Sequence, residues 1–207
     1  MNSIIFDYFD ELIPNPVCEL NYTSDYQLLI AVMLSAQTTD KRLNEVTKVL
    51  FEKYLNLEEL SVANIDDIIE IIKPLGTYHK KAQNIINISK KLLLYSDGVV
   101  PNNREFLESL DGVGRKTTNV VLSILYNMPF IAVDTHVSRV SKRLGFANEN
   151  DSVLEIENKL YKLVPLDRMN KIHHQLLLFG RYHCKALKPM CKDCKLKKIC
   201  KEKKELF

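Results

Sequence analysis

The 207-residue chain contains few glycines and prolines, six and seven respectively. Proteins built from short strands and turns, and chains without stable structure, usually contain more of both, so these classes are disfavoured. No apolar stretch reaches the roughly 20 residues that cross a bilayer. The N-terminus has no basic segment followed by an apolar one, so no secretory signal is predicted. We therefore expect a cytoplasmic protein without a membrane partner.

Helical patterns dominate what the sequence does contain. Hydrophobic residues make up 46% of the chain, which is enough to form a core. Residues 40–55 carry apolar side chains at helical spacing, and no segment shows a convincing strand-like alternation. Ser24 with Gln27, and Ser152 with Glu155, have the spacing of a capping box at a helix start. The sequence predicts an all-α protein of about ten helices.

The net charge of +3 is unevenly distributed. Ten basic and two acidic residues lie between Arg181 and Lys204, a local charge of +8 that leaves −5 on the rest of the chain. A basic tail on a slightly acidic body indicates a polyanionic partner, most simply nucleic acid. The alternative is a solvated tail that only improves solubility, but the cysteine spacing inside the tail argues against it.

A glycine turn lies in the segment LDGVGRKTT, residues 110–118. Helical segments are predicted on both sides, and we expect Gly112 and Gly114 to supply the tight turn because glycine adopts positive φ at little cost. Successive N–H groups in such a turn, followed by a helix N-terminus, can bind a phosphate without reading DNA sequence. An ordinary helix–helix turn is the alternative, and the short G-x-G pattern alone does not exclude it.

Lys116 lies in the first turn of the helix that follows. The dipole of that helix and the adjacent Arg115 both oppose protonation of its amine. Burial beside the apolar segment 119–125 would lower the pKa of the amine further and favour a nucleophilic role. A surface lysine that contacts phosphate is the alternative, and this segment does not decide between them.

Asp134 lies 18 residues later, in VDTHV, directly before a predicted helix. At an N-cap its carboxylate is favoured as the anion. The residue can therefore be a simple cap or the charged partner of a neutral amine. If the two groups touch, Asp134 raises the lysine pKa and opposes the other effects.

Four cysteines in the basic tail have the spacing C-x6-C-x2-C-x5-C: Cys184, Cys191, Cys194 and Cys200. In a cytoplasmic protein such a group indicates a metal site rather than disulfides. Zinc and a [4Fe–4S] cluster both accept four thiolates, so the spacing leaves both open.

The glycine turn with Lys116, the motif around Asp134 and the cysteine spacing together resemble the endonuclease III family. This is a family of bacterial DNA glycosylases and AP lyases with a helix-hairpin-helix motif, and the resemblance covers almost the whole chain. It implies two helical domains with DNA in the cleft between them. Residues 18–128 would form a six-helix domain with the helix-hairpin-helix, and residues 1–17 with 129–207 an iron–sulfur cluster domain.

The resemblance also assigns roles to individual residues. Lys116 and Asp134 would be catalytic, and the four tail cysteines would hold a [4Fe–4S] cluster. Gln37 would fill the gap left by the extruded nucleotide. Thr77, Gly112, Gly114 and Arg115 would contact DNA, and Glu108 and His136 match positions near the active site.

The sequence departs from the family pattern at three positions. Asp111 replaces the usual proline of the glycine turn, which removes preorganisation and places a negative charge near a phosphate site. Thr118 replaces an alanine. Thr77 stands where the family has a leucine-like wedge, which puts strand wedging in doubt.

The resemblance implies base excision repair of oxidised pyrimidines in double-stranded DNA, followed by β-elimination 3′ to the abasic site. We expect a monomer that acts on the bacterial nucleoid. Adenine or mismatch-thymine glycosylases are an alternative, but they generally lack the lysine, and adenine glycosylases carry an additional C-terminal domain. A non-catalytic DNA-binding module with a structural metal site would explain the basic tail and the turn, but not the match of both Lys116 and Asp134.

Overall fold

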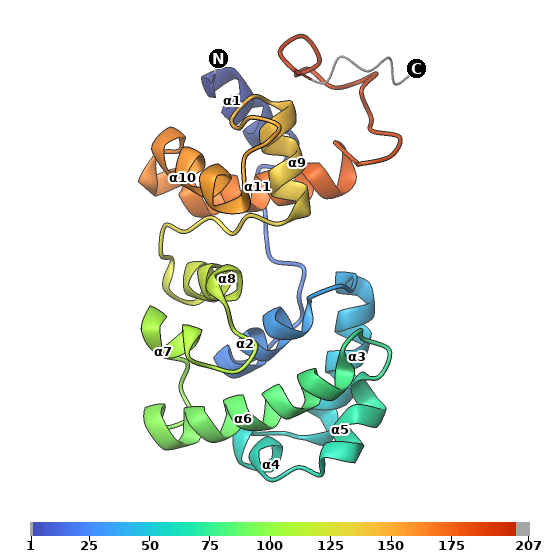
Figure 1. Ribbon diagram of the computed structural model, residues 1–207. Coiled ribbons are helices and arrows are strands. Elements are labelled where there is room, and N and C mark those ends of the chain that lie inside the picture. The colour runs from blue at the N-terminus through green and yellow to red at the C-terminus, as the bar shows by residue number, and fades with distance from the viewer. Residues whose placement is uncertain (1, 202–207) are drawn as a thin grey trace. The chain divides into compact units, whose positions relative to one another are not determined.

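The computed structural model describes residues 2–201, and within this range every element of regular secondary structure is a helix, as predicted (Figure 1). Its helices are α1 (Asn2–Leu12), α2 (Asp25–Leu34), α3 (Asp40–Lys53), α4 (Leu57–Ser61), α5 (Ile65–Ile72), α6 (Tyr78–Ser96), α7 (Arg104–Glu108), α8 (Arg115–Tyr126), α9 (Thr135–Arg143), α10 (Val153–Leu163), the short 3-10 helix η1 (Leu166–Arg168) and α11 (Met169–Tyr182). None of the described helices is long and apolar enough to cross a membrane. The basic tail is described as far as Lys201, and its residues 202–204 lie outside the described residues.

The chain divides into two compact units. The central unit, named for its place in the sequence, spans Glu19–Tyr126 and contains α2 to α8. The terminal unit combines the N-terminal segment through Cys18 with the chain from Asn127 onward. Each unit therefore has its own core and its own part of the expected site.

The central unit is built around α2. Every residue of this helix from Gln27 to Leu34 is buried, as expected for a helix enclosed by its neighbours. The long helix α6 lies beside α4 and α5, and α8 packs against α2. Because α6 and α8 flank the segment 97–114, this packing determines where the glycine turn is held.

The terminal unit is closed by an ionic contact between distant segments. Asp10 of α1 accepts hydrogen bonds from Arg168 Nη2 at 2.6 Å and from Gln175 Nε2 at 3.0 Å, and Lys171 Nζ lies 2.7 Å from Oδ1 of the same carboxylate. The hydrogen bond from Lys171 is the main reason that the pKa of Asp10 is lowered. Below these polar contacts, Phe9 and Phe179 pack with ring centroids 5.1 Å apart in the core.

The helix starts follow the local sequence rules with one exception. The capping box of Ser152 and Glu155 is present in full, as predicted. At α2 the prediction is wrong, because the Ser24 hydroxyl makes no capping bond and is buried without a partner. Gln27 Oε1 instead accepts bonds from the backbone N–H and hydroxyl of Thr23, at 2.8 and 2.9 Å. The Gln27 side chain therefore reaches back to Thr23, one residue beyond Ser24, whose backbone N–H it would contact in a capping box.

Candidate active site and nucleic-acid interface

The glycine turn joins α7 to α8, and its two glycines serve different purposes. Gly112 has φ +78°, and a Cβ at this position would lie 2.3 Å from Nδ2 of Asn84 on α6. Gly114 is not among the residues with positive φ, and a Cβ there would meet no atom within 4 Å. The expectation that both glycines provide positive φ is therefore wrong for Gly114. Only Gly112 is required by the fold, and the space beside Gly114 remains free for a ligand.

Arg115 and Lys116 are the first two residues of α8, and both are exposed. The predicted first-turn position of Lys116 is confirmed, and of the two alternatives that the sequence left open, a buried or a surface lysine, the structure shows the surface one. The apolar side chains Val121 and Leu122 face the core instead. Thr118, at a position where alanine is usual, is fully buried, and its hydroxyl lacks a hydrogen-bond partner.

Gln37 and Thr77 have the same unusual backbone conformation. Gln37 has φ +61° and Thr77 has φ +57°, in the left-handed region that non-glycine residues rarely adopt. Both residues are exposed, and Gln37 Oε1 would lie 3.5 Å from a Cβ on Gly76, the neighbour of Thr77. The fold thus presents two strained, exposed residues close together, although they are 40 positions apart in sequence. Strain of this kind is concentrated at functional sites.

Asp134 caps helix α9, as predicted. Its Oδ1 accepts a hydrogen bond from the backbone N–H of Val137 at 2.7 Å, and its side chain is half-buried. The following helix also carries His136, whose Nδ1 lies 3.3 Å from Nη2 of Arg139. Asp134 and His136 belong to the terminal unit, whereas Lys116 belongs to the central unit. The pairing of Lys116 with Asp134 remains a prediction.

Glu108 takes part in an ionic network within the central unit. Arg104 donates to Glu108 Oε1 at 2.7 Å and, through its other terminal nitrogen, to Oδ1 of the buried Asn119 at 2.7 Å. This network joins α7 to α8 on either side of the glycine turn. Glu108 thereby supports the hairpin.

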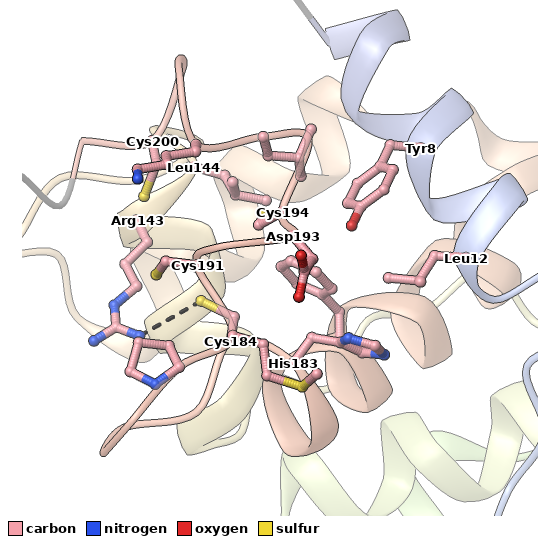
Figure 2. A pocket seen from close by; sticks show the side chains of 15 residues that line it. Tyr8, Leu12, Arg143, Leu144, His183, Cys184, Cys191, Asp193, Cys194 and Cys200 are labelled. Carbon is pink, nitrogen blue, oxygen red and sulfur yellow. Dashed lines mark hydrogen bonds between the residues drawn. The ribbon is translucent and has the colours of Figure 1, made fainter. Parts of the chain in front are cut away.

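The four tail cysteines line one cavity in the terminal unit. Cys184, Cys191, Cys194 and Cys200 surround it together with side chains of α1, α9 and α11 (Figure 2). The cavity has a volume of about 180 Å³, and its lining is predominantly apolar. Arg143 donates to Cys184 Sγ at 3.5 Å and to the carbonyl oxygen of Lys185 at 2.8 Å. The fold therefore gathers four cysteine thiols that are spread over 17 residues into one shielded space.

Burial raises the pKa of the Cys194 thiol, and negative charge on Cys184, Cys191 and Cys200 acts in the same direction. A bound cation would reverse both effects, because metal binding stabilises thiolates. Across residues 2–201, no three His, Cys, Asp or Glu side chains are arranged closely enough to hold a metal ion as they stand. The donor set and the common cavity fit a four-thiolate group, whereas the present side-chain positions do not form a completed cage.

Sequence reasoning did not find Lys81. This lysine of α6 is only 4% exposed, and its Nζ donates to the carbonyl oxygen of Ala36 at 2.8 Å. Burial lowers the pKa of its amine. The signal was present in the sequence, because Lys81 shares its helix face with Ile85 and Ile88 at spacings of four and seven.

Comparison with known proteins places this arrangement in a family. Residues 30–166 match the HhH-GPD superfamily of base excision DNA repair proteins. Endonuclease III of Bacillus subtilis is 46% identical over 196 residues, which cover 95% of this chain and 90% of that protein. The structure of a trapped endonuclease III–DNA covalent intermediate is 44% identical, with a TM-score of 0.92, covering 98% of this chain and 96% of that one.

A thermostable thymine-DNA glycosylase has the same fold, with a TM-score of 0.80 and coverage of 97% of this chain and 95% of that one, but only 22% identity. This similarity supports the fold alone. The much higher identity to endonuclease III confirms the resemblance and, with it, the assignment as a DNA glycosylase and lyase of base excision repair. The chain belongs to the endonuclease III family, within the HhH-GPD superfamily of base excision DNA repair proteins.

Proposed function

We propose that this protein removes oxidised pyrimidines from double-stranded DNA and then cleaves the strand 3′ to the abasic site, with Lys116 as nucleophile. The observation that carries the proposal is the position of Lys116. Its exposed amine lies in the first turn of α8, two residues after Gly114. A Cβ at Gly114 would meet no atom within 4 Å, so the backbone there is open to a ligand. A phosphate bound at this turn would bring the adjoining deoxyribose close to that amine. Similarity to a trapped covalent complex of endonuclease III with DNA supports covalent catalysis.

The proposed chemistry begins with a flipped nucleotide, because C1′ is inaccessible within the stacked duplex. The neutral Lys116 amine attacks C1′, and the bonding electrons of the N-glycosidic bond leave with the base, which is protonated. The anionic Asp134 stabilises positive charge on the sugar and accepts a proton from the amine. The sugar ring opens to a Schiff base on Lys116.

The Schiff base then permits strand cleavage. The protonated imine withdraws electrons and acidifies the C2′ proton. Loss of that proton forms a C2′–C3′ double bond and expels the 3′ phosphate with the electrons of the C3′–O bond. Water hydrolyses the imine and regenerates the Lys116 amine. Each turnover therefore consumes water and requires no oxidant or reductant.

The remaining residues hold the DNA. We assign residues 18–128 to the domain with the helix-hairpin-helix, where Gly112, Gly114 and Arg115 bind a phosphate. Gln37 and Thr77 contact the region vacated by the nucleotide. Residues 1–17 and 129–207 form the cluster domain, and we expect a monomer that acts at the bacterial nucleoid in the cytoplasm.

The cysteine cavity is proposed to hold a [4Fe–4S] cluster. Cys184, Cys191, Cys194 and Cys200 would each supply one thiolate. Bound there, the cluster would link the tail to the helices of the terminal unit and place the basic side chains between the cysteines where they can meet phosphates. The cleavage steps above need no electron transfer, so we assign the cluster to structure and DNA contact.

The activity is tested by incubating the protein with a duplex that contains one abasic site. We expect cleavage on the 3′ side, leaving a 3′ unsaturated aldehyde and a 5′ phosphate. A protein that only binds DNA would leave the strand intact. A panel of duplexes with oxidised pyrimidines, mismatched thymine or mispaired adenine then identifies the substrate, and excision confined to either mismatch would contradict the proposed class.

The two glycines of the turn provide a matched pair of variants. Gly112→Ala should destabilise the protein by about 1–3 kcal/mol, because the methyl group meets Asn84 in a left-handed backbone conformation. Gly114→Ala should cost at most about 1 kcal/mol, because its surroundings are open. It should nevertheless weaken duplex binding about tenfold by holding a phosphate away from the backbone. Chemical unfolding and DNA titration measure the two effects separately.

An unaltered affinity in Gly114→Ala would show that no phosphate approaches this residue.

A further inference from the structure

Four polar residues form a stripe along one face of α6. Lys81, Asn84, Asn87 and Lys91 are separated by three, three and four positions, which places them on the same side of a helix. Such a stripe normally faces water, but Lys81 is 4% and Asn84 7% exposed. We call these residues the α6 polar stripe. Its two ends contact two different segments of the central unit.

The N-terminal end of the stripe holds the segment that carries Gln37. Lys81 Nζ donates to the carbonyl oxygen of Ala36 at 2.8 Å, and the next residue is the strained Gln37. A buried ammonium group is unfavourable unless polar partners offset its desolvation. A buried lysine is therefore a poor choice for packing alone, but it can fix a backbone carbonyl from across the unit.

The C-terminal end of the stripe holds the glycine turn. Asn87 Nδ2 donates to Asp111 Oδ2 at 2.6 Å, and Lys91 Nζ lies 3.5 Å from Asp111 Oδ1. Lys91 also donates to the carbonyl oxygen of Ser109 at 2.9 Å. Between these contacts, Asn84 packs directly against Gly112.

These contacts give Asp111 a structural role in the turn. In the family pattern this position is a proline, which restricts the backbone on its own. Here the carboxylate connects the turn to α6 through a hydrogen bond and an ion pair. Lys91 also offsets the negative charge that Asp111 would otherwise present near a bound phosphate.

We propose that the α6 polar stripe is a positioning element, through which one helix sets the spacing between the Gln37 segment and the glycine turn. The residues of the stripe act through Ala36, Ser109, Asp111 and Gly112 and do not themselves touch the DNA. This inference rests on the proposed function, since it assumes that both segments contact the duplex. Asp111 is the part of this device that departs from the usual family pattern.

The turn end is tested by measuring the affinity for a duplex with a non-cleavable abasic analogue, tetrahydrofuran, over a range of salt concentrations. Asp111→Ala removes a negative charge, so general electrostatics predict tighter binding. Positioning predicts the opposite, a loss of about fivefold to tenfold. Asp111→Asn, which keeps the acceptor for Asn87, should lose less. Tighter binding by Asp111→Ala would overturn the proposal.

Lys91→Met distinguishes positioning from phosphate contact. If Lys91 contacts a phosphate, its removal should make the slope of log K against log salt shallower by about 0.9. If Lys91 acts only by positioning, the slope should stay unchanged. The effects of Lys91→Met and Asp111→Ala should not add, because both break the same connection. The neighbouring, exposed Lys90 gives the control variant Lys90→Met. Additive losses with a reduced slope would reject the positioning role of Lys91.

The Gln37 end is tested by the ratio of affinities for the tetrahydrofuran duplex and an undamaged duplex. Lys81→Met should reduce this preference about tenfold and have no further effect when Gln37→Ala is already present. Lys80→Met alters the adjacent exposed lysine and should leave the preference unchanged. If Lys81→Met has the thermal stability of the wild type and also its preference for the tetrahydrofuran duplex, this part of the proposal is overturned.

These binding measurements do not depend on catalysis, because the tetrahydrofuran analogue is not cleaved. Wild-type protein that binds the analogue but fails to cleave abasic DNA would refute the proposed lyase activity and leave the positioning result intact. Wild-type cleavage together with unaltered binding in all stripe variants would refute the positioning role alone.

Discussion

Lys116→Ala is expected to lose abasic-site cleavage by at least about a thousandfold, because the variant has no amine to form the Schiff base. Borohydride reduces an imine to a stable amine, so wild-type protein should be trapped as a covalent adduct with abasic DNA. The variant should form no adduct. Lys116 is exposed, and its side chain supports no part of the core, so the change should leave folding intact.

Arg115→Ala is the matched control for this experiment. Arg115 is the adjacent residue, it is also exposed, and it lies on the same first turn of α8. Its loss should weaken DNA binding and reduce the salt dependence, but the borohydride adduct should still form when DNA is in excess. An adduct of equal strength in Lys116→Ala would show that another amine is the nucleophile and would refute the mechanism.

The sequence predicted those parts of the site that depend on neighbouring residues. The N-cap at Asp134, the capping box at Ser152 and the first-turn position of Lys116 all follow from a few adjacent side chains. Local hydrogen bonds and helix periodicity are visible in a sequence. The helical fold class follows from the same kind of signal, repeated along the chain.

The predictions from sequence were wrong or undecided where the surroundings of a side chain depend on more than its immediate neighbours in the chain. At α2 the Gln27 side chain accepts from Thr23 and not from the backbone of Ser24, and the Ser24 hydroxyl makes no capping bond. The sequence left the burial of Lys116 undecided, and in the structure the residues after it turn their apolar side chains inward and leave the lysine outside. Local sequence gives the periodicity of a helix but does not specify how far its first turn projects from the core.

Long-range polar contacts could not be read from the sequence at all. The bond from Lys81 to Ala36 spans 45 positions, and that from Asn87 to Asp111 spans 24. In sequence, Asp111 is only a departure that places an unfavourable charge beside a phosphate site. In the structure, Asn87 and Lys91 hold and offset that charge. A local departure from a family pattern was therefore explained by a helix elsewhere in the chain.

Cys194→Ser is expected to abolish the iron–sulfur cluster. Purified wild-type protein should be brown and contain about four iron and four sulfide per chain, whereas the variant should lose most of both. Cys194 provides the test because its thiol is half-buried in the shared cavity, where serine cannot replace a thiolate ligand. Because metal binding stabilises the folded state, the variant should also unfold at a lower temperature.

The fifth cysteine supplies the control. Cys18 does not line the cavity, so Cys18→Ser should retain colour, iron and sulfide. Stoichiometric zinc in colourless wild-type protein would instead assign the four thiolates to a zinc site. The lyase assay separates the cluster from the chemistry: if the cluster serves structure and DNA contact, residual folded Cys194→Ser should bind DNA more weakly yet still form the borohydride adduct through Lys116. A stably folded variant that binds DNA normally but forms no adduct would show that the cluster takes part in the reaction.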